Sequence, residues 1–168
     1  SIFHSVSAFC NAGIDILGSD SLAKYICNPL INITTMLLII LSGIGFSVWY
    51  DVLGNIKKIR KKEIPGKWWF TRLRLHSKLA IVTTLILLAV GTLLTFLLEY
   101  HNPDTIGHLN FGEKWMASAF QSVTTRTAGY STFSQAGMHE ETRFLNILLM
   151  FIGGSPGGTA GGVKTTTI

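Results

Sequence analysis

The stretch LAIVTTLILLAVGTLLTFLL, residues 79–98, decides the fold class of this chain, because it runs 20 positions without Asp, Glu, Lys or Arg. A helix of about 20 apolar residues is long enough to cross the roughly 30 Å hydrocarbon core of a bilayer. Two further uncharged stretches have similar lengths, residues 29–50 and 144–163. The last one contains many glycines and Pro156, so we expect its helix to break partway through the membrane. The pattern predicts an all-α membrane protein.

The composition supports a membrane chain and argues against a soluble domain. Of its 168 residues, 48% are hydrophobic and only 14% are charged, and the mean hydropathy is +0.40, whereas a soluble domain is about 25% charged. The net charge of +5 is local, since nine of the 14 Lys and Arg residues lie between Lys57 and Lys78. A single block differs from the basic face of a nucleic-acid-binding protein, so no nucleic-acid partner is expected.

The basic block also predicts which side of the membrane each segment faces. Cytoplasmic loops are enriched in Lys and Arg, so residues 51–78 are expected to form a cytoplasmic linker, with Trp68 and Trp69 at its membrane-facing edge. Residues 99–143 then lie outside. Within them, residues 112–125 favour a helix that is too short and too polar to cross the membrane. That helix must lie outside, or dip into the membrane and return.

An internal repeat favours the re-entrant arrangement. Three pairs of segments match: FHSVS (3–7) with FQSVT (120–124), NAGI (11–14) with TAGY (127–130), and LINI (30–33) with FLNI (144–147). The repeating unit is a helix, a short re-entrant helix, an Ala-Gly turn and a second helix. Residues 1–50 would hold the second half of one unit, namely a pore loop and the transmembrane helix after it. Residues 79–168 would hold nearly all of the next unit.

The unit has the chemistry of a pore loop for cations. A selectivity filter replaces the hydration shell of an ion with backbone carbonyls. Glycine reaches the backbone dihedrals that aim successive carbonyls at one axis, and Gly13 and Gly129 occupy equivalent places after the two short helices. A re-entrant helix that enters from outside also points its partly negative C-terminal end toward the membrane centre, which favours a cation.

Four segments resemble the Trk/Ktr/HKT superfamily of potassium transporters, and the bacterial Ktr-type membrane subunit most of all. They are SAFCNAG (7–13), LSGIGF (41–46), SVTTRTAGY (122–130) and GGSPGGTAGGVKTTT (153–167). The resemblance implies four helix–pore-loop–helix repeats around one central ion pore. This chain would then be a fragment of a four-repeat chain, covering the end of the second repeat and most of the third.

The resemblance assigns roles to particular residues. One filter strand would comprise Cys10, Asn11, Ala12, Gly13 and Ile14, and another Thr127, Ala128, Gly129 and Tyr130. The gate would be an intramembrane loop containing Gly153, Gly154, Pro156, Gly157, Gly158, Gly161 and Gly162. Both positions that separate potassium-preferring from sodium-preferring members hold glycine, which implies potassium bound through backbone carbonyls.

Arg126 is a charge directly before the second predicted filter strand. We expect it to support the filter from behind, against a carboxylate or carbonyl groups. The alternative is a direct functional role, because ionisable residues inside a membrane commonly mark ion pathways.

The implied function is potassium uptake across a bacterial plasma membrane by a multi-pass protein. The resemblance implies a homodimer of the full-length chain, bound to a cytoplasmic nucleotide-binding regulatory ring. No cofactor is expected in this chain, and a coupling or activating role for sodium stays open. Two other functions also stay open: a membrane assembly subunit without its own pore, and a secondary transporter with broken helices.

Simpler interpretations of the same residues carry less weight. The glycine-rich segment comes near a phosphate-binding Walker pattern, but Val163 separates glycine from Lys164 and no strand precedes it. Helix packing through small residues accounts for some of the glycines but not for Pro156 among them. The scattered His and Cys residues lack the spacing of metal ligands, and no catalytic set is visible, so an enzyme is not expected.

Overall fold

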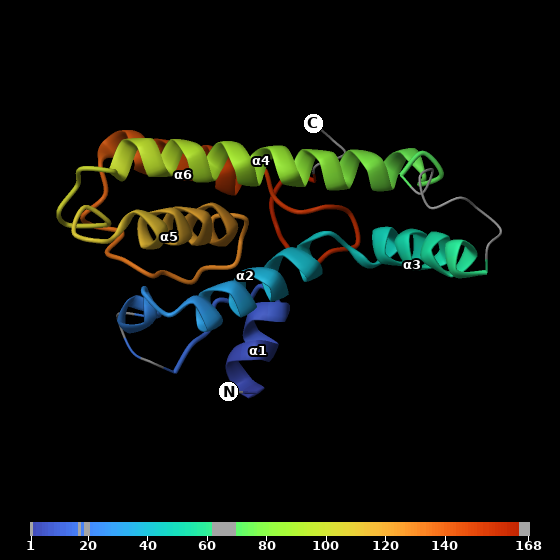
Figure 1. Cartoon of the computed structure of the whole chain (residues 1–168), viewed down its shortest axis with the longest axis horizontal. Helices are drawn as coiled ribbons and strands as arrows, with labels where there is room; N and C mark the ends of the chain where they lie inside the picture. The colour runs from blue at the N-terminus through green and yellow to red at the C-terminus, as the bar shows by residue number, and fades with distance from the viewer. Residues whose placement is uncertain (1, 17, 19–20, 62–69, 165–168) are drawn as a thin grey trace.

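The computed structural model describes residues 2–16, 18, 21–61 and 70–164, and within them the chain is helical (Figure 1). The helices are, in chain order, α1 (Ile2–Phe9), the 3-10 helix η1 (Ala23–Tyr25), α2 (Pro29–Gly43), α3 (Phe46–Arg60), α4 (Leu75–Glu99), α5 (Phe111–Thr124) and α6 (Glu140–Phe151). The strand-like pairing among these residues is an isolated bridge between Ile152 and Val163. This architecture agrees with the all-α fold class that the sequence predicts.

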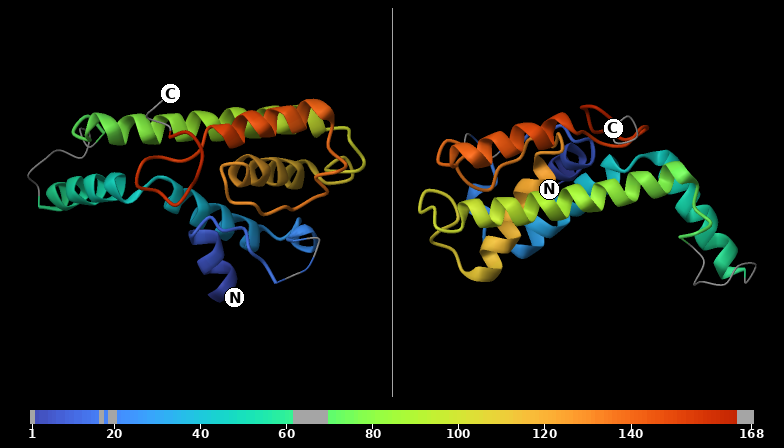
Figure 2. Two further views of the ribbon diagram at one scale, coloured as in Figure 1. Left: turned by 180° about the vertical axis from the view of Figure 1, so that it is seen from behind. Right: turned by 90° about the horizontal axis from the view of Figure 1, so that it is seen from above.

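The short helix α5 joins the two copies of the repeat. α5 packs against α4, which belongs to its own copy, and against α2, which belongs to the preceding one. α2 also packs against α1, α6 against α4, and α3 against α4. In Figures 1 and 2, the non-helical segment after α6 reaches from α6 toward the junction of α2 and α3. The segments that the sequence predicts as filter and gate therefore lie near the centre of the molecule.

α4 has the length and composition of a membrane span. It has 25 residues, and among the residues described it is the one unbroken helix that could cross a bilayer by itself. Small residues, including Ala80, Thr84 and Gly91, line its buried face. At Gly91 a Cβ atom would lie 2.4 Å from Ser122 Oγ, which donates to the Leu88 carbonyl (3.0 Å). Small residues that allow such close approach are typical of helix pairs in membranes.

The expectation of one continuous helix over residues 29–50 is wrong. Two helices, α2 and α3, meet there at an angle of 96°. The break lies at Gly45, whose φ of 93° falls in the left-handed region that glycine adopts without steric cost. Trp49 Nε1 donates to the Leu41 carbonyl (2.8 Å), which satisfies one of the acceptors left free at the end of α2. Because no charge marks this break, an uncharged run by itself does not reveal it.

α3 extends into the segment expected to form the cytoplasmic linker. It ends at Arg60, so residues 51–60 are helical and carry the first part of the basic block. Positive charge in the last turn of a helix is favoured by the helix dipole. Lys67, Trp68 and Trp69 lie outside the described residues.

The third uncharged stretch is helical only in its first part. α6 begins at Glu140 and ends at Phe151, and the chain from there to Lys164 is not helical. The short helix predicted over residues 112–125 is also present, as α5. The helix boundaries of the second copy therefore follow its sequence pattern more closely than those of the first.

A buried carboxylate fixes the segment between α4 and α6. Glu99, the last residue of α4, is 0% exposed. It accepts hydrogen bonds from Asn102 Nδ2 (2.6 Å), Thr105 Oγ1 (2.6 Å) and the backbone N–H of His139 (2.9 Å). Asn102 also donates to the Gly137 carbonyl (2.8 Å). These bonds compensate the burial of the carboxylate and tie the turn after α4 to the start of α6.

Replacing Glu99 with alanine should lower the free energy of unfolding by about 2–4 kcal/mol, because three donors lose their acceptor in a buried site. Thermal or denaturant unfolding of the full-length protein in detergent would measure the change. Glu99→Gln keeps one acceptor oxygen and should cost less. Glu141→Ala removes an exposed carboxylate from the first turn of α6 and serves as the control. Equal losses for Glu99→Ala and Glu141→Ala would contradict a stabilising role for the buried group.

Candidate ion-conduction site

The two Ala-Gly turns have the same backbone conformation. In the first turn, Asn11 and Gly13 have positive φ angles of 50° and 65°. In the second, Thr127 and Gly129 have φ angles of 74° and 87°. Each pair has an alanine between its members. Residues other than glycine seldom adopt positive φ, so the same pattern at matching positions indicates one local structure built twice.

Each turn is held by the same hydrogen bonds to its short helix. The Ser7 hydroxyl donates to the Ile14 carbonyl (2.6 Å), and at the equivalent positions Thr124 Oγ1 donates to the Tyr130 carbonyl (2.7 Å). The carbonyls of Ser7 and Thr124 both accept the backbone N–H of the alanine in their own turn, each at 3.0 Å. A hydroxyl residue near the end of each helix therefore sets the position of the turn that follows.

The carbonyl groups inside the turns lack donors. Within the described part of the chain, the carbonyls of residues 10–13 and 127–129 accept no hydrogen bond. The carbonyls of Ile14 and Tyr130, also predicted for the filter, are by contrast engaged by the hydroxyls of Ser7 and Thr124. Backbone carbonyls are obligatory acceptors, and all of these residues except Ala128 are exposed or half-buried, so their oxygens are open to a partner from outside the described residues. A cation is a partner that such oxygens can take.

The two turns lie side by side. A Cβ atom on Gly13 would be 2.4 Å from the Ala128 carbonyl oxygen, and one on Gly129 would be 3.4 Å from Gly13 Cα. Behind the turns, Tyr130 Oη donates to Ser7 Oγ (2.7 Å) and so bonds the second turn to the first short helix. The predicted filter segments of the two copies are therefore brought together, although they are far apart in sequence.

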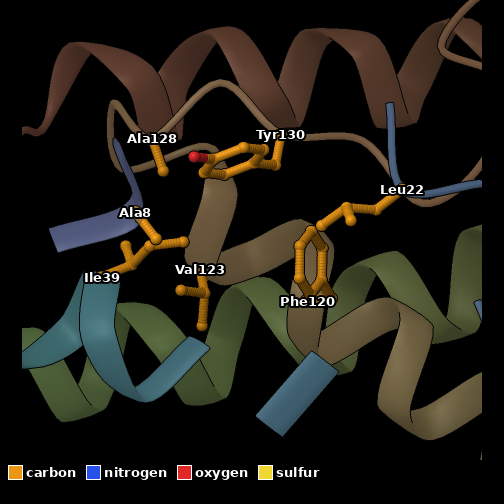
Figure 3. Close-up of a cluster of buried hydrophobic side chains, with 7 residues drawn as sticks. All are labelled: Ala8, Leu22, Ile39, Phe120, Val123, Ala128 and Tyr130. Atoms are coloured by element: carbon orange, nitrogen blue, oxygen red, sulfur yellow. The ribbon is translucent and has the colours of Figure 1, made fainter. Parts of the chain in front are cut away.

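A buried apolar cluster supports both turns from behind (Figure 3). Its members are Ala8, Leu22, Ile39, Phe120, Val123, Ala128 and Tyr130. They come from both copies of the repeat, and Figure 3 shows Ala8 and Ile39 gathered with Val123 below Ala128 and Tyr130. Close packing of this kind leaves side chains little room to shift, so it fixes the turns relative to each other.

The glycine-rich segment after α6 is a closed loop. Gly153 N donates to the Val163 carbonyl (3.0 Å), and Val163 N donates to the Phe151 carbonyl (3.0 Å). A Cβ atom on Gly153 would lie 1.6 Å from the Gly161 carbonyl oxygen, and one on Gly162 would lie 2.8 Å from Gly153 Cα. Because there is no room for a side chain, glycine is required where the two arms of the loop approach.

On one side, the loop caps the break between α2 and α3. Ser155 N donates to the Gly43 carbonyl (3.1 Å). Thr159 N donates to the Ser42 carbonyl (3.3 Å). These are two of the last four carbonyls of α2, which need partners outside the helix. The first N–H of α3 donates in turn to the Gly157 carbonyl (3.2 Å), so the loop is bonded to both helices at their junction.

On its other side, the same loop is hydrogen bonded to both filter turns. Asn11 Nδ2 donates to Thr159 Oγ1 (2.9 Å). Gly161 N donates to Thr127 Oγ1 (3.0 Å). Asn11 and Thr127 are the equivalent left-handed residues of the two copies, so the loop contacts each turn at the same place.

Arg126 also bonds to the glycine-rich loop. Its side chain is 8% exposed, and Nη2 donates to the Gly153 carbonyl (3.2 Å). The expected carbonyl partner is therefore present, but it lies in the predicted gate rather than in the filter. Arg126 Nε is buried and has no hydrogen-bond partner among the described residues. The guanidinium group adds a second link between the second turn and the loop, and a third between the two turns and the loop.

The site is built from backbone oxygens and small residues. In the described residues, no group of three or more His, Cys, Asp or Glu is placed to hold a metal ion. The family model for TrkH, described as a cation transport protein, matches residues 1–168. The chain belongs to the TrkH family. This is a family of cation transporters and not of enzymes, and the chain is accordingly part of a multi-pass plasma-membrane protein.

Relatives in the TrkH family resemble this chain along nearly its whole length. The Ktr system potassium uptake protein B of Bacillus subtilis is 42% identical over 167 residues, which are 99% of this chain and 35% of that protein. The potassium/sodium uptake protein NtpJ of Enterococcus hirae is 42% identical over 170 residues, covering 100% of this chain and 34% of that protein. The chain thus spans about a third of the length of the curated relatives it matches.

A solved structure in the same family has the same fold. The crystal structure of the potassium transporter TrkH from Vibrio parahaemolyticus matches with a TM-score of 0.73 and 20% sequence identity, covering 98% of this chain and 32% of that one. The likeness extends over nearly all of this chain and supports the fold described above.

Sequence reasoning missed the side chains that join the predicted filter to the predicted gate. Ser7 and Thr124 hold the turns, and the repeat offered a signal for them, since a hydroxyl residue occupies both positions. Thr159 is the loop residue bonded to the first turn, and nothing in its sequence context marks it. Cys10 is exposed and its sulfur is not in a disulfide.

Gly13→Ala in the full-length protein should disturb the site more than Gly129→Ala. A Cβ atom at Gly13 meets a carbonyl oxygen at 2.4 Å, whereas at Gly129 the nearest contact of 3.4 Å is ordinary. Gly129→Ala then mainly costs the left-handed strain, about 1–2 kcal/mol. Thermal unfolding of the full-length protein in detergent would measure the effect as a drop in unfolding temperature. Gly112→Ala, where no atom lies within 4 Å, is the control. The opposite order of the two variants would contradict the close approach of the turns.

Proposed function

We propose that this chain supplies two strands of a potassium-selective filter, together with the loop that gates it, in a protein for potassium uptake. The observation that carries the proposal is the pair of adjacent turns whose carbonyls lack donors within the described residues. A partly dehydrated monovalent cation is a partner that such oxygens stabilise. The names of the relatives as potassium uptake proteins support the same ion.

The electrostatics of the site favour a cation over an anion. α1 and α5 both end directly before a filter turn, so the partly negative C-terminal ends of two helices face the same region. The nearby Arg126 guanidinium is bonded to the Gly153 carbonyl, in the loop. The turns therefore offer negative potential from both the helix ends and the carbonyl oxygens.

Potassium is proposed in preference to sodium because Gly13 and Gly129 occupy both filter positions seen here. In the superfamily that the sequence resembles, glycine at these positions accompanies preference for potassium. Sodium is kept in the proposal as a coupling or activating ion, since one relative is named a potassium/sodium uptake protein.

The proposed gate is the loop that contains Gly153, Gly154, Pro156, Gly157, Gly158, Gly161 and Gly162. It is bonded to Asn11, Arg126 and Thr127 through side chains, and it caps α2. Each hydrogen bond contributes about 0.5–1.5 kcal/mol, so these three side-chain bonds oppose movement of the loop by a few kcal/mol. That is the size of free energy that binding of a regulatory partner can supply.

For the whole protein, we propose a homodimer of the full-length chain whose cytoplasmic face binds a nucleotide-binding regulatory ring. The two alternative functions explain less of the structure. A pore-less assembly subunit has no use for two turns whose carbonyls receive no hydrogen bond from the described residues. A secondary transporter would offer the ends of its broken helices to a substrate, whereas here the end of α2 is capped by the chain's own loop.

Gly129→Ser in the full-length protein should reduce the preference for potassium over sodium, because a side chain on a left-handed residue displaces the carbonyls on either side. Uptake of the two ions by cells that lack other potassium uptake systems, or by proteoliposomes, would measure the preference. Gly112→Ser is the matched control in an open position of α5. An unchanged preference in a protein that still takes up potassium would count against the filter assignment.

Thr159→Val should raise potassium flux by about fivefold, because the closed loop loses the bond from Asn11, worth about 1 kcal/mol. Thr34→Val is the matched control, since Thr34 Oγ1 bonds to carbonyls of its own helix. Deleting part of residues 153–162 should raise the flux further. Lower or unaltered flux in variants that reach the membrane would argue for a packing role of the loop.

A further inference from the structure

A polar pocket lies between α3 and the start of α4, in a part of the molecule that the proposed filter and gate do not use. Its volume is about 360 Å³. Three basic side chains line it, Lys58 from α3 and Arg72 and Arg74 from the segment that leads into α4. Ligand pockets commonly have volumes of about 300–1,000 Å³, so the space is large enough for a small charged group.

The described residues that line the pocket carry a net positive charge. Among the described residues that line it, Asp51 is the one acidic residue. Its Oδ2 accepts the backbone N–H of Arg74 (2.8 Å), and its Oδ1 accepts Asn55 Nδ2 (3.4 Å). Within the described residues, the side chains of Lys58, Arg72 and Arg74 form no ion pair. The Asp51 carboxylate thus bonds α3 to the residue before α4. The three basic residues that line the pocket have no ion-pair partner among the described residues.

Two further features make the pocket suitable for an oxyanion. α4 begins at Leu75, and among the described residues no side chain caps its first N–H groups. The uncapped N-terminus of a helix attracts anions through these N–H groups and the helix dipole. In addition, Ser47 lines the pocket, and its hydroxyl is buried without a partner among the described residues. Because this oxygen is closed to solvent here, the Ser47 side chain has to rotate before it can donate to a phosphate oxygen.

We propose that this pocket binds the phosphate headgroup of an anionic membrane lipid. The pocket lies at the end of α4 that adjoins the basic block, which is the cytoplasmic end by the positive-inside rule. Basic pockets between helices on that side are suited to lipid headgroups. Apolar side chains beside the pocket are exposed as well, since Tyr50 is 75% exposed, Leu53 56% and Leu75 73%. Acyl chains would cover this surface, whereas a free phosphate would leave it bare.

The proposal is tested by binding, which does not depend on the filter or the gate. The full-length protein is purified in detergent and stripped of lipid. Phosphatidylglycerol, phosphatidylcholine and inorganic phosphate are then added separately, and bound lipid is counted by native mass spectrometry while the unfolding temperature is recorded. The test variant is Lys58→Gln with Arg72→Gln. The matched control is Lys57→Gln with Lys61→Gln, which removes the same charge from exposed positions that do not line the pocket.

Phosphatidylglycerol should bind the wild-type protein saturably and raise its unfolding temperature. The test variant should bind about thirtyfold more weakly, because each basic side chain near an anionic lipid is worth about a fivefold change in affinity. The control pair should bind as the wild type does. A third variant, Lys58→Arg with Arg72→Lys, keeps both charges and should retain binding, which distinguishes lost charge from a damaged fold.

Three results would overturn the proposal. Equal weakening in the test and control pairs would indicate general attraction of lipid to the basic block. If inorganic phosphate raised the unfolding temperature as much as phosphatidylglycerol does, the pocket would be a site for free phosphate. Absence of a lipid effect, together with loss of a cytoplasmic partner from the test variant, would assign the pocket to an acidic protein surface.

Discussion

The structure depends on backbone oxygens that receive no hydrogen bond from the described part of their own chain. In a bilayer, non-helical backbone is tolerated where protein or a water-filled space surrounds it. Here the ends of each turn are anchored by a hydroxyl, Ser7 or Thr124, so the carbonyls between the anchors stay free. The buried cluster behind the turns, and the close contact of α4 with α5 at Gly91, hold these free groups in place.

The need of every backbone carbonyl for a donor also explains why the chain can break after α2. Its last four carbonyls accept from Ile44 N, from the Trp49 indole and from two N–H groups of the glycine-rich loop. The loop therefore takes the place that a further helical turn would have occupied. If the loop moved away, two carbonyls at membrane depth would lose their donors until water or another group replaced them. This cost favours the position that the loop has in this structure, in addition to the bonds that it makes with Asn11 and Thr127.

The sequence predicted the helical class, α4, α5 and the early end of α6, because charge, length and glycine content mark them locally. It also predicted that the two turns lie together, because they occupy matching places in the repeat. Length without charge marks α4, and the repeat aligns Gly13 with Gly129. It did not predict the corner at Gly45, since the uncharged run continues across it. It also did not predict the contacts of Thr159 and Arg126 with distant segments, because a hydrogen bond between residues far apart in the chain leaves no spacing pattern.

The bond between Tyr130 and Ser7 has a consequence for biogenesis. The two residues are separated by 123 positions, and a ribosome adds about 5–20 residues per second. The first turn therefore emerges roughly 6–25 seconds before the side chain that completes its support. During that interval the free carbonyls of the first turn need water or another polar partner, because unpaired backbone groups are not tolerated against lipid.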